Sequence, residues 1–232
     1  MKRPDGRAFD ELRKIECEVG VIPNANGSAR FTIGKTVAIA AVYGPRTMYP
    51  KHDQEPKNAV LNCKYNLMSF SVDERKKPAP SRRDTELSLI TSNSLSSVVF
   101  LEAYPRTVID VYIEIPQADA GTRCAGICAA SMALADAGIQ MRGLVGSISV
   151  GTLGKQVVAD LTKEEEDWEE GATDMPIAYS PETGLLTSLQ LDGEIDKNSF
   201  KEALDLGIKK CVEIIELEKK ALKKNYEKEG EK

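Results

Sequence analysis

The chain lacks the features of a secreted, membrane-spanning or metal-rich protein. Its 232 residues include one histidine and five cysteines, and no two cysteines stand in a Cys-x-x-Cys pair. An odd number of cysteines with this spacing is typical of a reducing compartment. The sequence has no apolar run of about 18 residues, and its N-terminus has no signal-peptide core. We therefore expect a soluble, cytoplasmic protein with no membrane partner.

The chain also lacks a surplus of basic residues. Its formal net charge is −5 and its pI is near 5.2, which excludes a protein that coats nucleic acid through bulk attraction. Basic residues nevertheless cluster before and at Arg82 and Arg83, so any nucleic-acid contact should be local. A solvated surface loop is the alternative explanation for such a cluster.

Two of the cysteines, Cys124 and Cys128, are four residues apart in an alanine-rich segment. This spacing puts both thiols on one face of a helix, where they pack as small apolar groups or begin a metal site. Because His52 is the only histidine, core packing is favoured and we predict no metal site here.

Length and composition predict one domain over residues 1–232. Alternating and β-branched stretches predict strands, and capping boxes at Ser81 and Ser199 predict helix starts. Strands in groups with helices between them indicate an α+β fold. After Lys219 the apolar stripe of the last helix is lost, so we expect that end to fray. The predicted strands are 16–22, 29–32, 36–43, 59–71, 107–115, 145–151, 156–161, 177–179 and 185–191, and the helices begin near 81, 121 and 199.

The segment PQADAGTRCAG places Gly121, Thr122 and Arg123 at the start of an apolar helix. The first backbone amides of a helix have no intrahelical partner and carry the positive end of its dipole, so this turn is suited to phosphate. Arg123 would add a forked donor. An ordinary buried helix entered through a glycine turn is the alternative.

Arg82 and Arg83 fall in the first turn of another predicted helix, where cations face the positive end of the dipole. Pairing with Asp84 or Glu86 would offset this cost, and so would a bound anion. Both explanations stay open.

Two acids are candidates for proton transfer. Asp174 comes directly before the apolar stretch Met175–Ala178, which predicts a position at the edge of a strand. Asp167 lies in an acidic run. A turn or cap role for Asp174 and a solvated loop for Asp167 are the alternatives.

Several long motifs together resemble one family. PSRRDTEL, YPRTVIDVYIEIPQADAGTRCAG, ASMALADAGI and TDMPIA occur in this order, and they are similar to the RNase PH family, most of all to the catalytic subunits of archaeal exosomes. The similarity covers nearly the whole chain. It implies an RNase PH-like fold with two βαβ-type halves, mixed sheets and packed helices.

The resemblance also implies the activity and the partners. In this family inorganic phosphate, the co-substrate, attacks the last phosphodiester of RNA and releases a nucleoside 5′-diphosphate, in the 3′ to 5′ direction. The subunit alternates with an inactive homologue in a six-membered ring that carries RNA-binding cap subunits. Mg²⁺ is a further expected cofactor.

The resemblance further implies a role for each site residue. Gly121, Thr122, Arg123 and Arg83 match phosphate-binding positions, and Asp174 matches the catalytic carboxylate. Asp167 matches a second acidic position, although one extra residue separates the two acids here. Arg82 matches an RNA-phosphate contact. Asn62 and Lys64 stand where close relatives usually have arginines; Lys64 could still meet a backbone phosphate, whereas Asn62 cannot supply charge. His52 matches a channel contact with RNA, and a loop histidine in water is the alternative.

Three other functions stay open. They are a bacterial-type RNase PH homohexamer that trims tRNA ends, a non-catalytic RNA-binding ring subunit, and a hydrolytic nuclease. Asp174 together with the Gly121–Arg123 turn favours catalysis, and a phosphate-binding turn favours phosphorolysis over hydrolysis.

Overall fold

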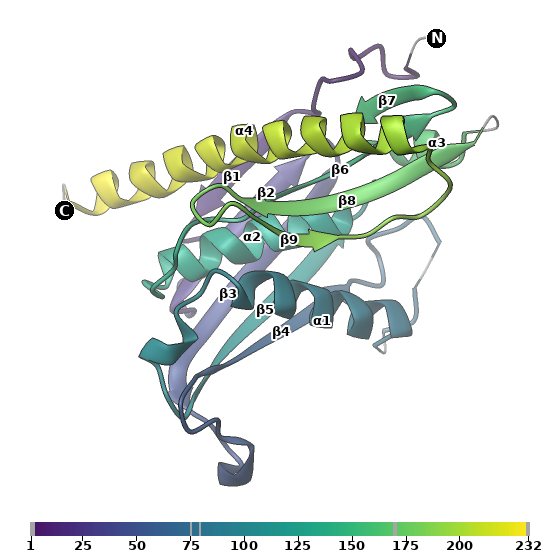
Figure 1. The fold of residues 1–232 in the computed structure, drawn as a ribbon. Helices are drawn as coiled ribbons and strands as arrows, with labels where there is room; N and C mark the ends of the chain where they lie inside the picture. The colour runs from purple at the N-terminus through teal and green to yellow at the C-terminus, as the bar shows by residue number, and fades with distance from the viewer. Residues whose placement is uncertain (1–2, 75, 79, 169–170, 231–232) are drawn as a thin grey trace.

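The computed structural model describes residues 3–74, 76–78, 80–168 and 171–230. Two β-sheets are connected by helices that contact strands of both sheets (Figure 1). This arrangement confirms the α+β class. None of the described helices combines the length and apolar character needed to cross a membrane.

The first sheet has five strands in the order β1-β2-β3-β5-β4. β1 to β3 form an antiparallel meander, whereas β4 runs parallel to β5. Helix α1 (Arg82–Ser96) connects these two parallel strands, which gives one βαβ unit. The strands are β1 (Ile15–Val19), β2 (Gly27–Ile33), β3 (Thr36–Thr47), β4 (Val60–Leu67) and β5 (Thr107–Gln117).

The second sheet has four strands in the order β7-β6-β8-β9, all antiparallel. A hairpin with Gly154 and Lys155 at its turn joins the first two strands of this order. A parallel pair is therefore confined to the first sheet among the described strands. The strands are β6 (Gly146–Leu153), β7 (Gln156–Ala159), β8 (Ala172–Ser180) and β9 (Leu185–Leu189).

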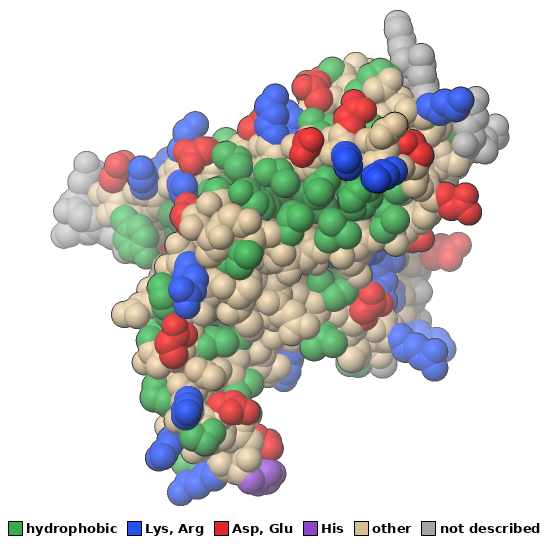
Figure 2. Space-filling view, in the orientation of Figure 1, with side chains coloured by type: hydrophobic (Ala, Val, Ile, Leu, Met, Phe, Trp, Pro, Cys, Tyr) green, Lys and Arg blue, Asp and Glu red, His purple; other side chains and the backbone are tan. Residues whose placement is uncertain are grey.

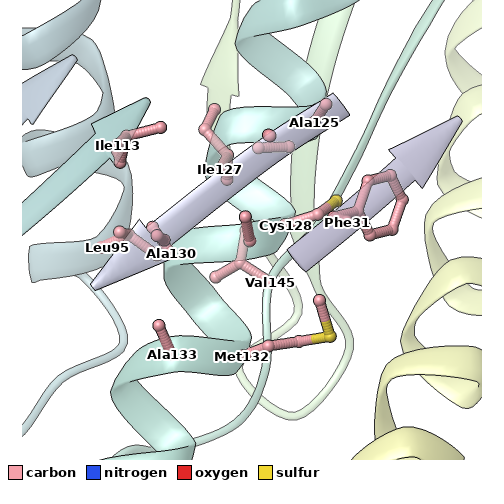
Figure 3. Close-up of a cluster of buried hydrophobic side chains, with 14 of the residues drawn as sticks. Phe31, Leu95, Ile113, Ala125, Ile127, Cys128, Ala130, Met132, Ala133 and Val145 are labelled. Atoms are coloured by element: carbon pink, nitrogen blue, oxygen red, sulfur yellow. The ribbon is translucent and has the colours of Figure 1, made fainter. Parts of the chain in front are cut away.

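Helix α2 (Thr122–Asp136) lies between the two sheets and is buried along nearly its whole length. Its alanines let both sheets approach, and larger side chains such as Phe31, Ile113 and Val145 pack around them (Figure 3). Cys124 and Cys128 belong to this buried helix, as expected. Because both sheets enclose the helix, the direction of its N-terminus is fixed.

The helix starts follow local side-chain chemistry, with one correction. Ser81 forms the predicted capping box with Asp84. The prediction for Ser199 is wrong, because α4 (Lys197–Gly230) begins earlier and the carboxylate of Asp196 accepts the amides of Asn198 and Ser199. The helix also continues through 219–230, the segment that we expected to fray, so loss of the apolar stripe does not end it.

Three short helices complete the fold. The 3-10 helices η1 (Lys51–Asp53) and η2 (Leu101–Ala103) lie in loops, and the loop with η1 extends away from the sheets (Figure 1). Helix α3 (Lys163–Glu166) follows β7 and was not predicted.

Helix α4 contains a buried acid, Glu218. Its side chain is fully buried, and neither carboxyl oxygen has a hydrogen-bond partner within the described part of the chain. Burial raises the pKa of Glu218 well above its usual value. The folded protein therefore keeps this carboxyl protonated at a pH where the unfolded chain ionises it, which costs stability.

We predict that Glu218→Gln flattens the dependence of stability on pH. In the wild type, ionisation of Glu218 costs no free energy of unfolding below about pH 4.3, the pKa of this side chain in the unfolded chain. Above that pH the free energy of unfolding falls by about 1.4 kcal/mol per pH unit until the folded pKa is reached. The glutamine variant should thus unfold at higher urea concentration near neutral pH. Glu202→Gln, on the exposed face of the same helix, is the control. Parallel stability curves for wild type and Glu218→Gln would contradict the prediction.

Candidate active site

A cavity of about 900 Å³ opens where the two sheets meet. The starts of α1 and α2 border it, β8 passes along it, and α3 and the loop after β4 complete its walls. Six residues predicted from the sequence line this one cavity: Arg83, Gly121, Thr122, Arg123, Asp167 and Asp174.

The Gly121-Thr122-Arg123 turn (hereafter the GTR turn) forms the N-terminus of α2. Gly121 has φ 65° and ψ 18°, a left-handed conformation that glycine adopts without strain. No side chain caps this helix end, so its first amides are available to an anion.

Thr36 holds the loop that leads into the GTR turn. Its hydroxyl donates to the Ala120 carbonyl at 2.7 Å and accepts from the Asp119 amide at 2.8 Å. Ala120 has φ 56°, an unfavourable conformation for a residue with a side chain. External hydrogen bonds of this kind maintain such a backbone shape.

The surroundings of α1 leave Arg83 without an acidic partner. The Asp84 carboxylate binds Lys76 Nζ at 2.6 Å and the Ser81 cap, rather than either neighbouring arginine. Among the described residues, neither Arg82 nor Arg83 has an acid within ion-pair distance. The expected alternative, pairing with Asp84, is therefore wrong.

Arg123 projects from the start of α2 toward the end of the second sheet. Its Nη1 donates to Gln190 Oε1 at 2.5 Å, and the Gln190 amide donates in turn to Glu86. Gln190 was missed in the sequence because it has no local motif. The contact orients the guanidinium of Arg123 without neutralising it.

Asp174 lies within β8, opposite Gly151 of β6, and not at the edge of a strand as predicted. Its backbone also exchanges two hydrogen bonds with Asp192, so Asp174 has a backbone partner on both sides of the strand. Its carboxylate accepts a short hydrogen bond from the Ser149 hydroxyl. Burial raises the pKa of Asp174, although Ser149, Arg123 and Arg83 favour its charged form.

Glu166 is a further acid of the cavity, and the sequence analysis did not single it out. It ends α3, where Thr162 and Glu165 form a capping box and Glu165 makes a buried ion pair with Arg3 at 2.7 Å. The side chain is open to the cavity, yet desolvation and the charge of Asp174 raise the pKa of Glu166 to about 7. The Thr162-x-x-Glu165 pattern was the available sequence signal for this helix.

Three predicted residues lie outside the cavity walls: Lys64, Arg82 and His52. Lys64 is on the exposed face of β4, with its ammonium 5.4 Å from the centre of the Tyr112 ring. His52 is in the loop with η1, beside Asp53. Asn62 donates to Asp110, which also binds Arg46.

Within the described residues, no three histidine, cysteine or acidic side chains are arranged to hold a metal ion. Mg²⁺ is usually bound through one or two carboxylates plus the phosphates of a substrate. Asp174, Asp167 and Glu166 are among the carboxylates of the cavity walls. Mg²⁺ therefore stays a prediction.

Comparison with known proteins identifies the family. Residues 11–140 match the model of the 3′ exoribonuclease family, domain 1, and residues 143–210 match domain 2. The chain belongs to this family, also called the RNase PH family.

Particular relatives are exosome components. The chain is 50% identical over 225 residues to exosome complex component Rrp41 of Pyrococcus abyssi, covering 97% of this chain and 90% of that protein. It is 46% identical to the Rrp41 component of Methanopyrus kandleri, over 97% of this chain and 93% of that protein.

Solved structures have the same fold. Rice Rrp46 superimposes with a TM-score of 0.84 at 24% identity, over 95% of this chain and all of that chain. A chain of the Archaeoglobus fulgidus exosome with RNA bound to the active site gives a TM-score of 0.78 at 25% identity, over 93% of this chain and 92% of that one.

We predict that anion binding weakens as Glu166 ionises. Sulfate is a suitable probe, because its charge does not change between about pH 5.5 and about pH 8.5, whereas a carboxyl with a pKa of about 7 loses its proton. Calorimetry should show sulfate affinity falling roughly threefold to tenfold across this range.

Two variants test the assignment to Glu166. Glu166→Gln should remove most of the pH dependence, and Glu164→Gln, an exposed neighbour on the same helix, should keep it. An unchanged pH profile in Glu166→Gln would assign the titration to another group.

Proposed function

We propose that this chain is the catalytic subunit of an archaeal exosome, a 3′ to 5′ exoribonuclease that degrades RNA by phosphorolysis. The observation that carries the proposal is one cavity lined by the GTR turn, by the unpaired guanidinium of Arg83 and by Asp174. Nucleophile and target are both anionic, so a site for their reaction needs positive charge and a proton donor together.

The proposed reaction uses inorganic phosphate as the nucleophile. The amides of the GTR turn and the side chains of Arg83 and Arg123 would bind it and offset its charge. A phosphate oxygen attacks the terminal phosphorus, the bond to the 3′-oxygen of the preceding nucleotide breaks, and a nucleoside diphosphate leaves.

Asp174 would supply the proton that the departing 3′-oxygen takes up. Its raised pKa favours the protonated form compared with an ordinary aspartate. Ser149 donates to Oδ1 of this carboxyl, which leaves Oδ2 as the oxygen that carries the proton. We propose that Asp167, the second acid, contributes to the charge balance of the cavity or to Mg²⁺ binding.

The RNA would approach along the face that carries the remaining predicted residues. Arg82, Lys64 and His52 are the proposed phosphate contacts. Phe70 is 73% exposed at the cavity rim, and an exposed aromatic ring of this kind is suited to stack on a base.

The exposed leucines of the second sheet are the proposed contact with the neighbouring ring subunit, the inactive homologue. β9 is an edge strand, and Leu185, Leu186, Leu189 and Leu191 on and beside it are 40 to 50% exposed. Hydrophobic side chains gather over α4 and the β8–β9 region (Figure 2). A long apolar edge of this kind is typical of an association surface. RNA-binding cap subunits complete the proposed assembly.

The proposed chemistry predicts a phosphate-dependent product. Mixed with the inactive homologue and a 3′-labelled oligo(A), the protein should shorten RNA only when phosphate is present and should release ADP. AMP released in phosphate-free buffer would contradict phosphorolysis.

In the same assay Asp174→Asn should lower the rate by at least about a hundredfold, because general acid catalysis contributes on that scale. RNA affinity should be nearly unchanged. Asp205→Asn, on the exposed face of α4, is the control. Wild-type turnover in Asp174→Asn would assign proton donation to another group.

The proposed ring contact predicts that Leu186→Lys with Leu189→Lys weakens assembly with the inactive homologue by at least about a hundredfold. Native mass measurement of the mixture should then give free subunits, while circular dichroism of the variant stays like that of the wild type. A wild-type chain that forms an active homohexamer without the homologue would favour the bacterial-type alternative.

A further inference from the structure

One buried guanidinium, that of Arg13, joins the two halves of the molecule directly behind the GTR turn. Its Nε and Nη2 donate to the two carboxylate oxygens of Asp160 at 2.9 and 2.7 Å. Its Nη1 donates to the backbone carbonyl of Asp119 at 2.5 Å. Asp160 follows β7 of the second sheet, whereas Asp119 lies in the loop after β5 of the first sheet.

Both ends of this connection are backbone segments in an unfavourable conformation. Asp160 and Ala120, the residue after Asp119, each have φ 56°. Residues with side chains keep such values only where their surroundings hold them. Arg13 binds one of these residues and the carbonyl directly before the other.

The packing of Arg13 leaves it little freedom. The residue is 9% exposed, and its Cδ lies only 2.5 Å from where a Cβ on Gly34 would stand. Its Nη2 lies 3.4 Å from the corresponding point on Gly121. The side chain thus passes over one glycine and ends against the other, beside the GTR turn. Arg13 is not among the cavity walls, so it acts on the site through the loop.

The far end of the connection also leads to the site. Arg3 and Arg7 donate to the Asp160 carbonyl at 2.8 and 3.1 Å, and Arg3 also forms the buried ion pair with Glu165 in α3. The next two residues, Glu166 and Asp167, are acids of the cavity. Asp160 therefore belongs to one hydrogen-bonded unit with α3, next to Glu166 and Asp167 (hereafter the acidic wall).

We infer that Arg13 is a positioning residue that sets the GTR turn against the acidic wall of the cavity. Because its planar guanidinium binds both Asp119 and Asp160, Arg13 keeps the first amides of α2 directed at the anion. It also keeps them at a constant distance from the acidic wall. This inference rests on the proposed function, because the bound anion is the phosphate nucleophile.

The geometry of the guanidinium group explains why arginine is needed at position 13. A planar guanidinium binds the carboxylate with two parallel donors and has a third donor left for the carbonyl. A lysine ammonium keeps the charge but cannot reproduce this geometry. Arg13→Lys therefore removes the shape of the guanidinium but keeps its charge, whereas Arg13→Gln removes both.

The test measures binding of inorganic phosphate to the isolated full-length chain by calorimetry, with no RNA present. Arg13→Gln and Arg13→Lys should both bind phosphate at least tenfold more weakly than the wild type. Arg7→Gln, which loses hydrogen bonds to the carboxylate and the carbonyl of the same Asp160 but none to the loop, should change the affinity less than twofold.

Two outcomes would overturn the inference. One is wild-type phosphate affinity in a folded Arg13→Lys variant, and the other is an equal loss of affinity in Arg7→Gln and Arg13→Gln. If Arg13→Gln does not fold, Arg13→Lys decides the matter alone.

Steady-state kinetics in the assembled ring add a readout that general destabilisation would not give. Arg13→Lys should raise KM for phosphate about tenfold while kcat at saturating phosphate falls less than threefold. A fall in kcat with unchanged KM would contradict a role in positioning the GTR turn. If RNA is shortened without phosphate, the proposed function fails, whereas the calorimetric result for Arg13 still stands or falls independently.

Discussion

The site depends on the burial of α2 between the two sheets. A helix enclosed on both sides cannot tilt or rotate, so its uncapped N-terminus points in one direction only. The walls of the cavity then come from elements that pack on the same two sheets. Each half of the fold supplies one part of the chemistry, with positive charge from α1 and α2 and carboxylates from β8 and α3.

Charge in this cavity is balanced over several groups instead of within fixed pairs. Asp84, the acid nearest to Arg83 in sequence, is bound by Lys76, and Arg123 is oriented by the neutral Gln190. The acids in turn are partly withdrawn from water, so the pKa values of Asp174 and Glu166 rise. An anion would therefore meet two unneutralised guanidiniums and at least one carboxyl with a tendency to keep its proton.

Much of the fold could be predicted from local patterns. Strand alternation, the Ser81 capping box and the glycine turn before α2 depend on neighbours in sequence, and the structure has all three. The positions that were missed depend on distant partners. α3 is held by Arg3 from the other end of the chain, and β8 begins before Asp174 because Ala172 and Thr173 pair with β6. The start of α4 was misplaced because two acceptable caps stand three residues apart and Asp196 takes the amides.

The same distinction applies to the site. The residue types of the GTR turn are enough to indicate an anion. Ser149 and Glu166 join the cavity, and Gln190 reaches Arg123, only through the folding of the second half of the chain. Arg13 shows the limit of sequence patterns most clearly, because its two partners are more than a hundred residues away.

The most direct test of the account is a crystal structure of the protein with selenate, whose anomalous signal locates a phosphate-like anion directly. The account predicts a peak about 3 Å from the amides at the start of α2, between Arg83 and Arg123. A peak elsewhere, with this helix end left to solvent, would contradict the claim that the N-terminus of α2 is the phosphate site.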